Sequence, residues 1–221
     1  MGQNIKLTAS DGFELDAYRA DPAGTPKGGI VVVQEIFGVN PHIRDVCDRF
    51  AALGYAAIAP AFFDRVEAGV SLDYVEPDIT TGRELAGKLD WNNTMKDAQA
   101  AIDALRSAGK VGVVGYCWGG TVAFRSTTVL DADCAVGYYG RLINDFLGET
   151  PKAPVMLHYG AEDASIPLEN VDAVKAAFPQ IPVNVFPGQH GFSCDARGSY
   201  HPDSAAKALE LTLGFFAEHL S

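Results

Sequence analysis

The strongest constraint on the fold is one short motif, GYCWGG, at Gly115–Gly120. It has the form glycine, any residue, nucleophile, any residue, glycine, with cysteine at the nucleophile position. Residues 110–114 (KVGVV) before it are predicted to form a short buried strand, and residues 121–125 to begin a helix. A sharp strand-to-helix turn raises Cys117 off the sheet edge, and the helix N-terminus favours a thiolate. Taken alone, the motif is also compatible with a buried structural cysteine.

A nucleophilic thiol needs a base, and that base needs an acid to orient it. Two apolar runs after the motif, residues 154–160 and 182–186, are predicted strands. Glu162 and Asp163 follow the first run, and the spacing from its terminal glycine favours Asp163 over Glu162. His190 follows the second run on a glycine-containing loop. Nucleophile, acid and histidine then occur in the chain order of α/β-hydrolases, which predicts a triad of Cys117, Asp163 and His190.

The overall pattern alternates strands and helices, which predicts a mostly parallel sheet with helices on both faces. Residues 5–18 are expected to open the chain as a hairpin, and residues 203–219 to close it as a helix. Eight strands in this order predict the α/β-hydrolase fold. Because no large insertion follows the strand at 134–139, we expect little or no cap over the site. The chain shows no repeat or linker, so residues 1–221 are expected to form a single domain.

The composition narrows the classes of partner. With 17 basic and 28 acidic residues the net charge is −11, which argues against binding nucleic acid or an anionic membrane. No apolar run reaches the length of a membrane span. Histidines and cysteines do not cluster at metal-ligand spacing, so we expect no metal and no cofactor. The four cysteines show no disulfide framework, and a free reactive thiol suits a reducing cytoplasm. We expect a cytoplasmic monomer.

The sequence resembles the dienelactone hydrolase family, the carboxymethylenebutenolidases, over nearly its whole length. The markers are residues 34–40 (QEIFGVN), the cysteine motif, residues 158–163 (HYGAED) and residues 190–192 (HGF). The QEIFG run and the cysteine motif together are highly specific, since other α/β-hydrolases rarely carry either one. The resemblance implies hydrolysis of a carboxylated, unsaturated lactone without a cofactor.

Two backbone amides are expected to hold the oxyanion that forms during acyl transfer. One is the N–H of Trp118, directly after the nucleophile. The resemblance implies that the other is the N–H of Ile36. It also implies that Glu35, an acidic residue at the end of an apolar strand, contacts and helps to activate the thiol. We therefore expect a resting thiol that is neutral and bonded to Glu35, and that ionises when substrate arrives.

The substrate-binding residues follow mainly from the resemblance. It implies that Arg83 grips the substrate carboxylate with two parallel hydrogen bonds. The best-known members carry a second arginine four residues after the catalytic histidine, where this chain has Cys194. Either Arg197, three residues further on, replaces it or this chain accepts a different acyl group. Phe37 is a candidate for the apolar wall of the pocket. Among the remaining histidines we expect a buried His158 and three at the surface: His42, His201 and His219.

These residues predict a hydrolase that opens an unsaturated lactone, of the dienelactone to maleylacetate type. Cys117 attacks the carbonyl, and His190, oriented by Asp163, transfers the protons. A cysteine-dependent carboxylesterase or thioesterase with another substrate is the nearest alternative. A further alternative is a non-catalytic binding protein of the same fold. The intact candidates for nucleophile, acid and base argue against it. The expected partner is a small lactone or ester that carries a carboxylate.

Overall fold

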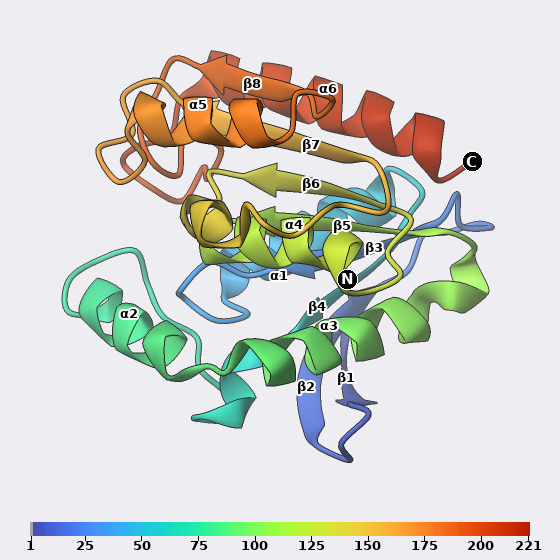
Figure 1. The fold of residues 1–221 in the computed structure, drawn as a ribbon. Helices are drawn as coiled ribbons and strands as arrows, with labels where there is room; N and C mark the ends of the chain where they lie inside the picture. Colours follow the sequence, from blue (N-terminus) through green and yellow to red (C-terminus); the bar gives the residue numbers. More distant parts are fainter. Residues whose placement is uncertain (1) are drawn as a thin grey trace.

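The computed structural model describes residues 2–221, which form one eight-stranded sheet with helices packed on both faces (Figure 1). The sheet order is β1-β2-β4-β3-β5-β6-β7-β8; β2 is antiparallel to both of its neighbours, and the strands from β4 to β8 are mutually parallel. The strands are β1 (Gln3–Thr8), β2 (Glu14–Ala20), β3 (Gly29–Val33), β4 (Ala56–Pro60), β5 (Val111–Tyr116), β6 (Cys134–Tyr138), β7 (Val155–Gly160) and β8 (Val183–Phe186). This confirms the predicted α/β-hydrolase fold.

Helices cover the sheet in two layers. The α-helices are α1 (Pro41–Ala52), α2 (Asp78–Lys88), α3 (Trp91–Leu105), α4 (Trp118–Thr128), α5 (Leu168–Ala177) and α6 (Pro202–His219). Three short 3₁₀ helices are η1 (Phe62–Arg65), η2 (Arg106–Ala108) and η3 (Arg141–Phe146). Helices α1 and α6 lie on one face, where Phe50 and Phe216 have ring centroids 6.1 Å apart, and α3, α4 and α5 cover the other.

The central strands read as continuous apolar runs because helices bury both of their faces. Every residue of β3, β4, β5 and β6 is buried. The parallel strands all end at the same edge of the sheet, and the loops that follow them carry the predicted site residues. No helix in residues 2–221 combines the length and the apolar character that a membrane crossing requires.

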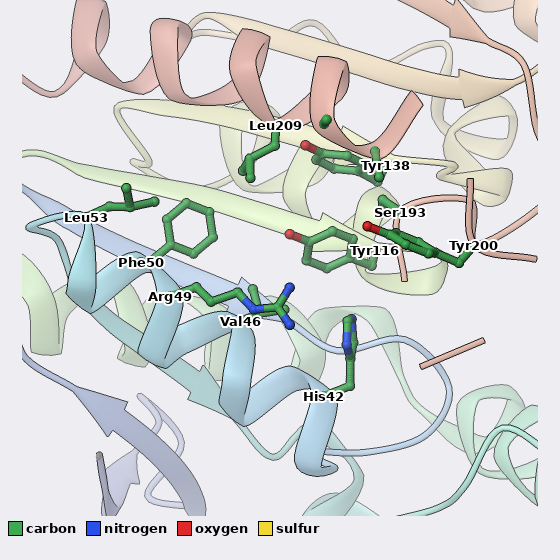
Figure 2. Close-up of a pocket in the computed structure, with 12 residues that line it drawn as sticks. His42, Val46, Arg49, Phe50, Leu53, Tyr116, Tyr138, Ser193, Tyr200 and Leu209 are labelled. Atoms are coloured by element: carbon green, nitrogen blue, oxygen red, sulfur yellow. The ribbon is translucent and has the colours of Figure 1, made fainter. Parts of the chain in front are cut away.

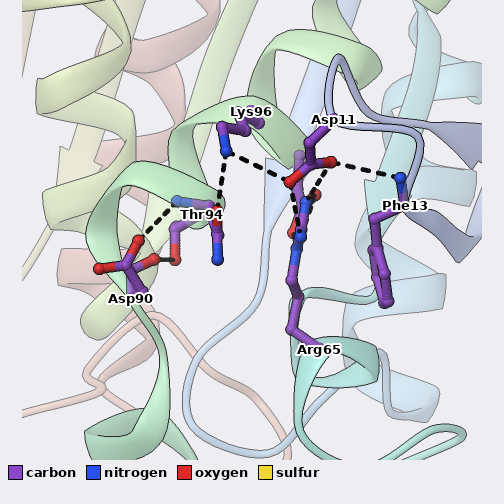
Figure 3. Close-up of polar contacts among 8 residues, drawn as sticks. Asp11, Phe13, Arg65, Asp90, Thr94 and Lys96 are labelled. Carbon is purple, nitrogen blue, oxygen red and sulfur yellow. Dashed lines mark hydrogen bonds and ion pairs between the residues drawn. The ribbon is translucent and has the colours of Figure 1, made fainter.

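A buried ion pair fixes the segment that leads from the sheet toward α2 (Figure 3). Arg65, at the end of η1, donates from Nη2 to Asp97 of α3 at 2.7 Å and from Nη1 to Asp11 of the β1–β2 turn at 2.9 Å. The Asp97 side chain has no exposed surface, and burial raises its pKa although Arg65 opposes the shift. A buried carboxylate is costly without such a partner. The network therefore holds the opening hairpin and η1 against α3.

Candidate active site

Cys117 lies on a strained turn directly after β5. Its backbone has φ 56° and ψ −117°, a region that residues other than glycine rarely adopt. The flanking glycines allow this turn to pack. A Cβ added at Gly115 would lie 1.8 Å from the carbonyl oxygen of Gly119, and one added at Gly119 would lie 2.4 Å from that of Gln34. The turn leaves the thiol partly exposed at the start of α4.

His190 and Asp163 form the pair that the sequence predicts. The Nδ1–H of His190 donates to Asp163 Oδ2 at 2.7 Å, and the backbone N–H of Ser165 donates to Asp163 Oδ1 at 2.8 Å. Asp163 is buried. The rival acid, Glu162, instead accepts the backbone N–H of Gly188. Of the two candidate acids, Asp163 is thus the one hydrogen-bonded to the imidazole.

The imidazole of His190 carries a strongly shifted pKa. Burial alone would lower it, but the negative charge of Cys117 and hydrogen bonds to Asp163 and Cys117 outweigh burial and raise the pKa of His190 to about 10. The shift requires both the thiol of Cys117 and the carboxylate of Asp163 to lie close to the imidazole.

Glu35 pairs with Arg197 in the structure. Its side chain is 1 % exposed, and Arg197 Nη1 donates to Glu35 Oε1 at 3.0 Å. No hydrogen bond joins Glu35 to Cys117 among residues 2–221, and Glu35 Oε2 has no partner there. A buried carboxylate gains more from a guanidinium than from a neutral thiol, which accounts for the difference from the expected contact. Arg197 also lies over the rings of Phe37 and Tyr74, 5.7 and 5.6 Å from their centroids.

Two backbone N–H groups face the nucleophile from different elements. Trp118 is the first residue of α4, and Ile36 follows β3 in the loop that carries Glu35. Within residues 2–221 neither amide donates to a backbone carbonyl or to a side chain. Both residues line the same cavity as Cys117. Such unpaired donors beside a nucleophile are suited to stabilising an oxyanion.

One cavity of about 380 Å³ holds the nucleophile and the histidine. Three arginines line it: Arg83 of α2, Arg141 at the start of η3, and Arg197. Its apolar wall consists of Ile36, Phe37, Ile79, Ala86, Trp118 and Leu142. Helix α2 approaches closely because of Gly82, where an added Cβ would lie 2.0 Å from the carbonyl oxygen of Ile36. Of the predicted site residues, Asp163 and Glu35 do not line this cavity; each instead hydrogen-bonds a residue that does, His190 and Arg197 respectively.

Sequence reasoning missed Arg141 and Ser165, which also line this cavity. A signal for Arg141 was present, since it comes two residues after the end of the predicted strand 134–139, at the edge of the sheet where ligands bind. Sequence reasoning was wrong about His42, which is buried. Its Nδ1 lies 3.1 Å from Oδ1 of Asp195, a residue far away in the sequence.

A second cavity, of about 260 Å³, lies between α1 and α6 (Figure 2). Phe50 and Leu209 form its apolar sides, and Tyr116, Tyr138 and His42 also line it. It contains none of the predicted catalytic or substrate-binding residues. This cavity is therefore separate from the one that holds Cys117 and His190.

Comparison with known proteins agrees with this geometry. The model of the dienelactone hydrolase family matches residues 15–220. A carboxymethylenebutenolidase of Pseudomonas putida is 34% identical over 229 residues, covering 97% of this chain and 96% of that protein. The crystal structure of a Klebsiella pneumoniae protein assigned as a dienelactone hydrolase superposes with a TM-score of 0.87 at 30% identity, covering 99% of both chains. The chain matches the family model and these relatives over nearly its whole length, and it therefore belongs to the dienelactone hydrolase family.

Proposed function

We propose that this chain is a carboxylic-ester hydrolase that opens a carboxylated, unsaturated lactone of the dienelactone type. One observation carries the proposal: the partly exposed thiol of Cys117 shares a cavity with His190, which Asp163 orients, and with the guanidinium of Arg83. A nucleophile, a base and an anion-binding group around one apolar cavity are the components that this hydrolysis needs.

The reaction begins when the Cys117 thiolate attacks the lactone carbonyl carbon. The N–H groups of Ile36 and Trp118 stabilise the oxyanion that forms. The bond from this carbon to the ring oxygen breaks, and that oxygen takes a proton from the His190 imidazolium. Neutral His190 then removes a proton from water, which attacks the thioester. When the tetrahedral intermediate collapses, the thiolate leaves and faces the imidazolium again, and the product carries a new carboxyl group.

Glu35 is proposed to take part in activating the thiol, as the family resemblance implies. Its pairing with Arg197 supports a route by which substrate acts on it, because an incoming carboxylate competes for the guanidinium. Glu35 Oε2, which has no partner within the described residues, can accept the thiol proton if Glu35 turns. That proton then passes to His190, whose imidazolium supplies it to the ring oxygen. In this proposal Glu35 is catalytic, while Arg83, Arg197 and Phe37 bind the substrate.

The first prediction tests the nucleophile. Cys117→Ala should abolish turnover of a carboxylated lactone while unfolding at nearly the wild-type urea concentration, because the side chain lies on a surface turn. Alkylation of wild type should inactivate it with one thiol modified. Cys134→Ala is the control, since burial raises the pKa of Cys134 to about 12 and keeps that thiol inert. Full turnover by Cys117→Ala would refute the mechanism.

The substrate class is tested by a panel of carboxylated lactones, neutral lactones, aryl esters and thioesters. The proposal expects the highest kcat/KM on a carboxylated lactone. A higher value on thioesters or simple esters would instead establish the cysteine-dependent esterase or thioesterase. Absence of turnover on the whole panel would favour a binding protein. A catalytic thiol is kept reduced in the cytoplasm, where we propose that the chain acts as a monomer; size-exclusion chromatography tests the latter.

A further inference from the structure

Two arginines of this chain have no compensating partner. Six of the nine arginines form ion pairs with carboxylates: Arg19, Arg49, Arg65, Arg106, Arg125 and Arg197. Arg44 donates to Asn4 and to the carbonyl of Val39. Arg83 and Arg141 make neither an ion pair nor a hydrogen bond within residues 2–221. Both are exposed residues, so the place where they lie decides what their free charge can do.

Both groups line the cavity that holds Cys117. None of the lining residues is acidic, although the chain has 28 aspartates and glutamates. Arg197 is compensated by Glu35, and His190 by Asp163. The positive charge left for a ligand therefore belongs to Arg83 and Arg141. A cleft lined by charge of one sign concentrates ligands of the opposite sign.

The sheet topology places the two arginines on opposite sides of the nucleophile. Helix α2, which carries Arg83, packs through Gly82 on Ile36, after β3. Arg141 begins η3, after β6. Strand β5, which ends beside Cys117, lies between β3 and β6 in the sheet. Two strand spacings separate β3 from β6 by roughly 10 Å. A ligand that reaches both guanidiniums thus passes over the thiol.

We propose that the substrate is a dianion, with one carboxylate for Arg83, one for Arg141, and the reacting carbonyl between them. This inference rests on the proposed hydrolase function and makes its substrate class specific. Arg141 supplies a second anion-binding subsite, since each guanidinium can hold one carboxylate with two parallel hydrogen bonds. Hydrolysis of such a substrate produces a trianion.

A matched series of four esters tests the two subsites. Phenyl acetate is neutral; 4-carboxyphenyl acetate carries a carboxylate on the leaving group; phenyl hydrogen succinate carries one on the acyl group; 4-carboxyphenyl hydrogen succinate carries both. For wild type, kcat/KM should rise with each added carboxylate. Arg141→Met should lose about tenfold to a hundredfold on esters that carry one of the two carboxylates, and Arg83→Met the same on esters that carry the other. On phenyl acetate each variant should lose less than on the esters whose carboxylate the replaced arginine binds.

The control is Lys88→Met, which makes the same change of net charge at an exposed position at the end of α2, outside the cavity. It should follow wild type on all four esters. Losses by Arg83→Met and Arg141→Met on the same monoanionic ester would overturn the proposal, because the two arginines would then share one carboxylate. Equal losses by Arg141→Met on phenyl acetate would overturn it as well.

A binding measurement separates this inference from the hydrolase function. In the Cys117→Ala variant, calorimetry should show adipate binding about tenfold or more tighter than hexanoate, a single carboxylate on a chain of the same length. Adding Arg83→Met or Arg141→Met should remove that advantage. If no ester is hydrolysed but adipate still binds in this way, the hydrolase function fails and the two subsites stand. Adipate that binds no tighter than hexanoate overturns the two subsites, whatever the activity.

Discussion

At the scale of single residues, the reactivity of the site depends on the charge shared by Cys117 and His190. The pKa of His190 reaches about 10 although burial opposes it, and the largest cause that raises it is the charge of Cys117. Its other partner, Asp163, is bonded at 2.7 Å and holds the ring in place. The second prediction concerns this coupling: replacing the thiol should remove most of the shift while the ring stays bonded to Asp163.

The measurement is the titration of His190 by NMR. In wild type it should titrate near pH 10, and in Cys117→Ala at a clearly lower pH, while Cys134→Ala should match wild type. Because the folded pKa lies above the ordinary value of 6.5, this group stabilises the fold fully below pH 6.5. That contribution is lost as the pH rises from 6.5 to about 10. Titration of wild type near 6.5 would instead indicate a neutral thiol and would support the resting state bonded to Glu35.

At the scale of elements, the position of α2 decides whether Arg83 and the amide of Ile36 act on the same substrate. The helix reaches the loop after β3 only because position 82 has no side chain, with a hypothetical Cβ 2.0 Å from the Ile36 carbonyl oxygen. The third prediction is that Gly82→Ala moves α2 away from this loop. The expected result is a loss of about tenfold or more in kcat/KM on a carboxylated lactone, since misplaced positioning groups are costly.

The fold should persist in this variant, because α2 lies at the edge of the structure and alanine favours helix. Circular dichroism and urea unfolding check this. Glu84→Ala is the control on the same helix, because Glu84 is exposed and lines neither cavity. Activity of Gly82→Ala equal to that of Glu84→Ala would show that the close approach is not needed for catalysis.

Elements that follow local rules were predictable from the sequence. The apolar run 111–116 and the glycines after it identified β5 and the turn at Cys117, because buried parallel strands and tight turns leave local patterns. Apolar periodicity alone predicts that α3 begins at Met95, four residues after its first residue, Trp91. Its start is set instead by Asp90, which caps the helix by accepting the N–H of Asn93 at 3.0 Å.

Contacts between distant parts of the chain were harder to predict from the sequence. Glu35 and Arg197 are 162 positions apart, so no local pattern pairs them. Family resemblance pointed to Arg83, but the helix that carries it has few buried residues and no clear core face. Arg141 matters only because sheet order brings the end of β6 beside the end of β5. The order of the strands along the chain does not determine which of them are neighbours in the sheet.

At the scale of the whole molecule, the acidic surface and the basic cavity are kept apart by pairing. Carboxylates hold most arginines on the outside, as Asp131 and Asp133 hold Arg106. Inside the molecule, burial instead disfavours the charged form of a titratable side chain, and His158 is an example. It lies on β7 with no exposed surface, between Thr212 of α6, 3.1 Å from Nε2, and Asn184 of β8, 3.3 Å from Nδ1. Burial lowers the pKa of His158 to about 3.

The last prediction is that His158 sets part of the acid sensitivity of the molecule. Because its folded pKa lies below the ordinary value of 6.5, the unfolded chain takes up the proton first as the pH falls. The neutral imidazole thus supports full stability above pH 6.5, and stability is lost between pH 6.5 and about 3, by up to about 1.4 kcal/mol per pH unit. His158→Gln, which cannot take up this proton, should be less stable than wild type at pH 7 because it packs less well. The difference in unfolding free energy between this variant and wild type should narrow at pH 5.5 and again at pH 4.

The control is His219→Gln, at a partly exposed position at the end of α6. Its unfolding free energy should change with pH as that of wild type does. Urea unfolding at the three pH values measures the difference, and a difference that stays constant for His158→Gln would mean that carboxylates alone govern acid unfolding.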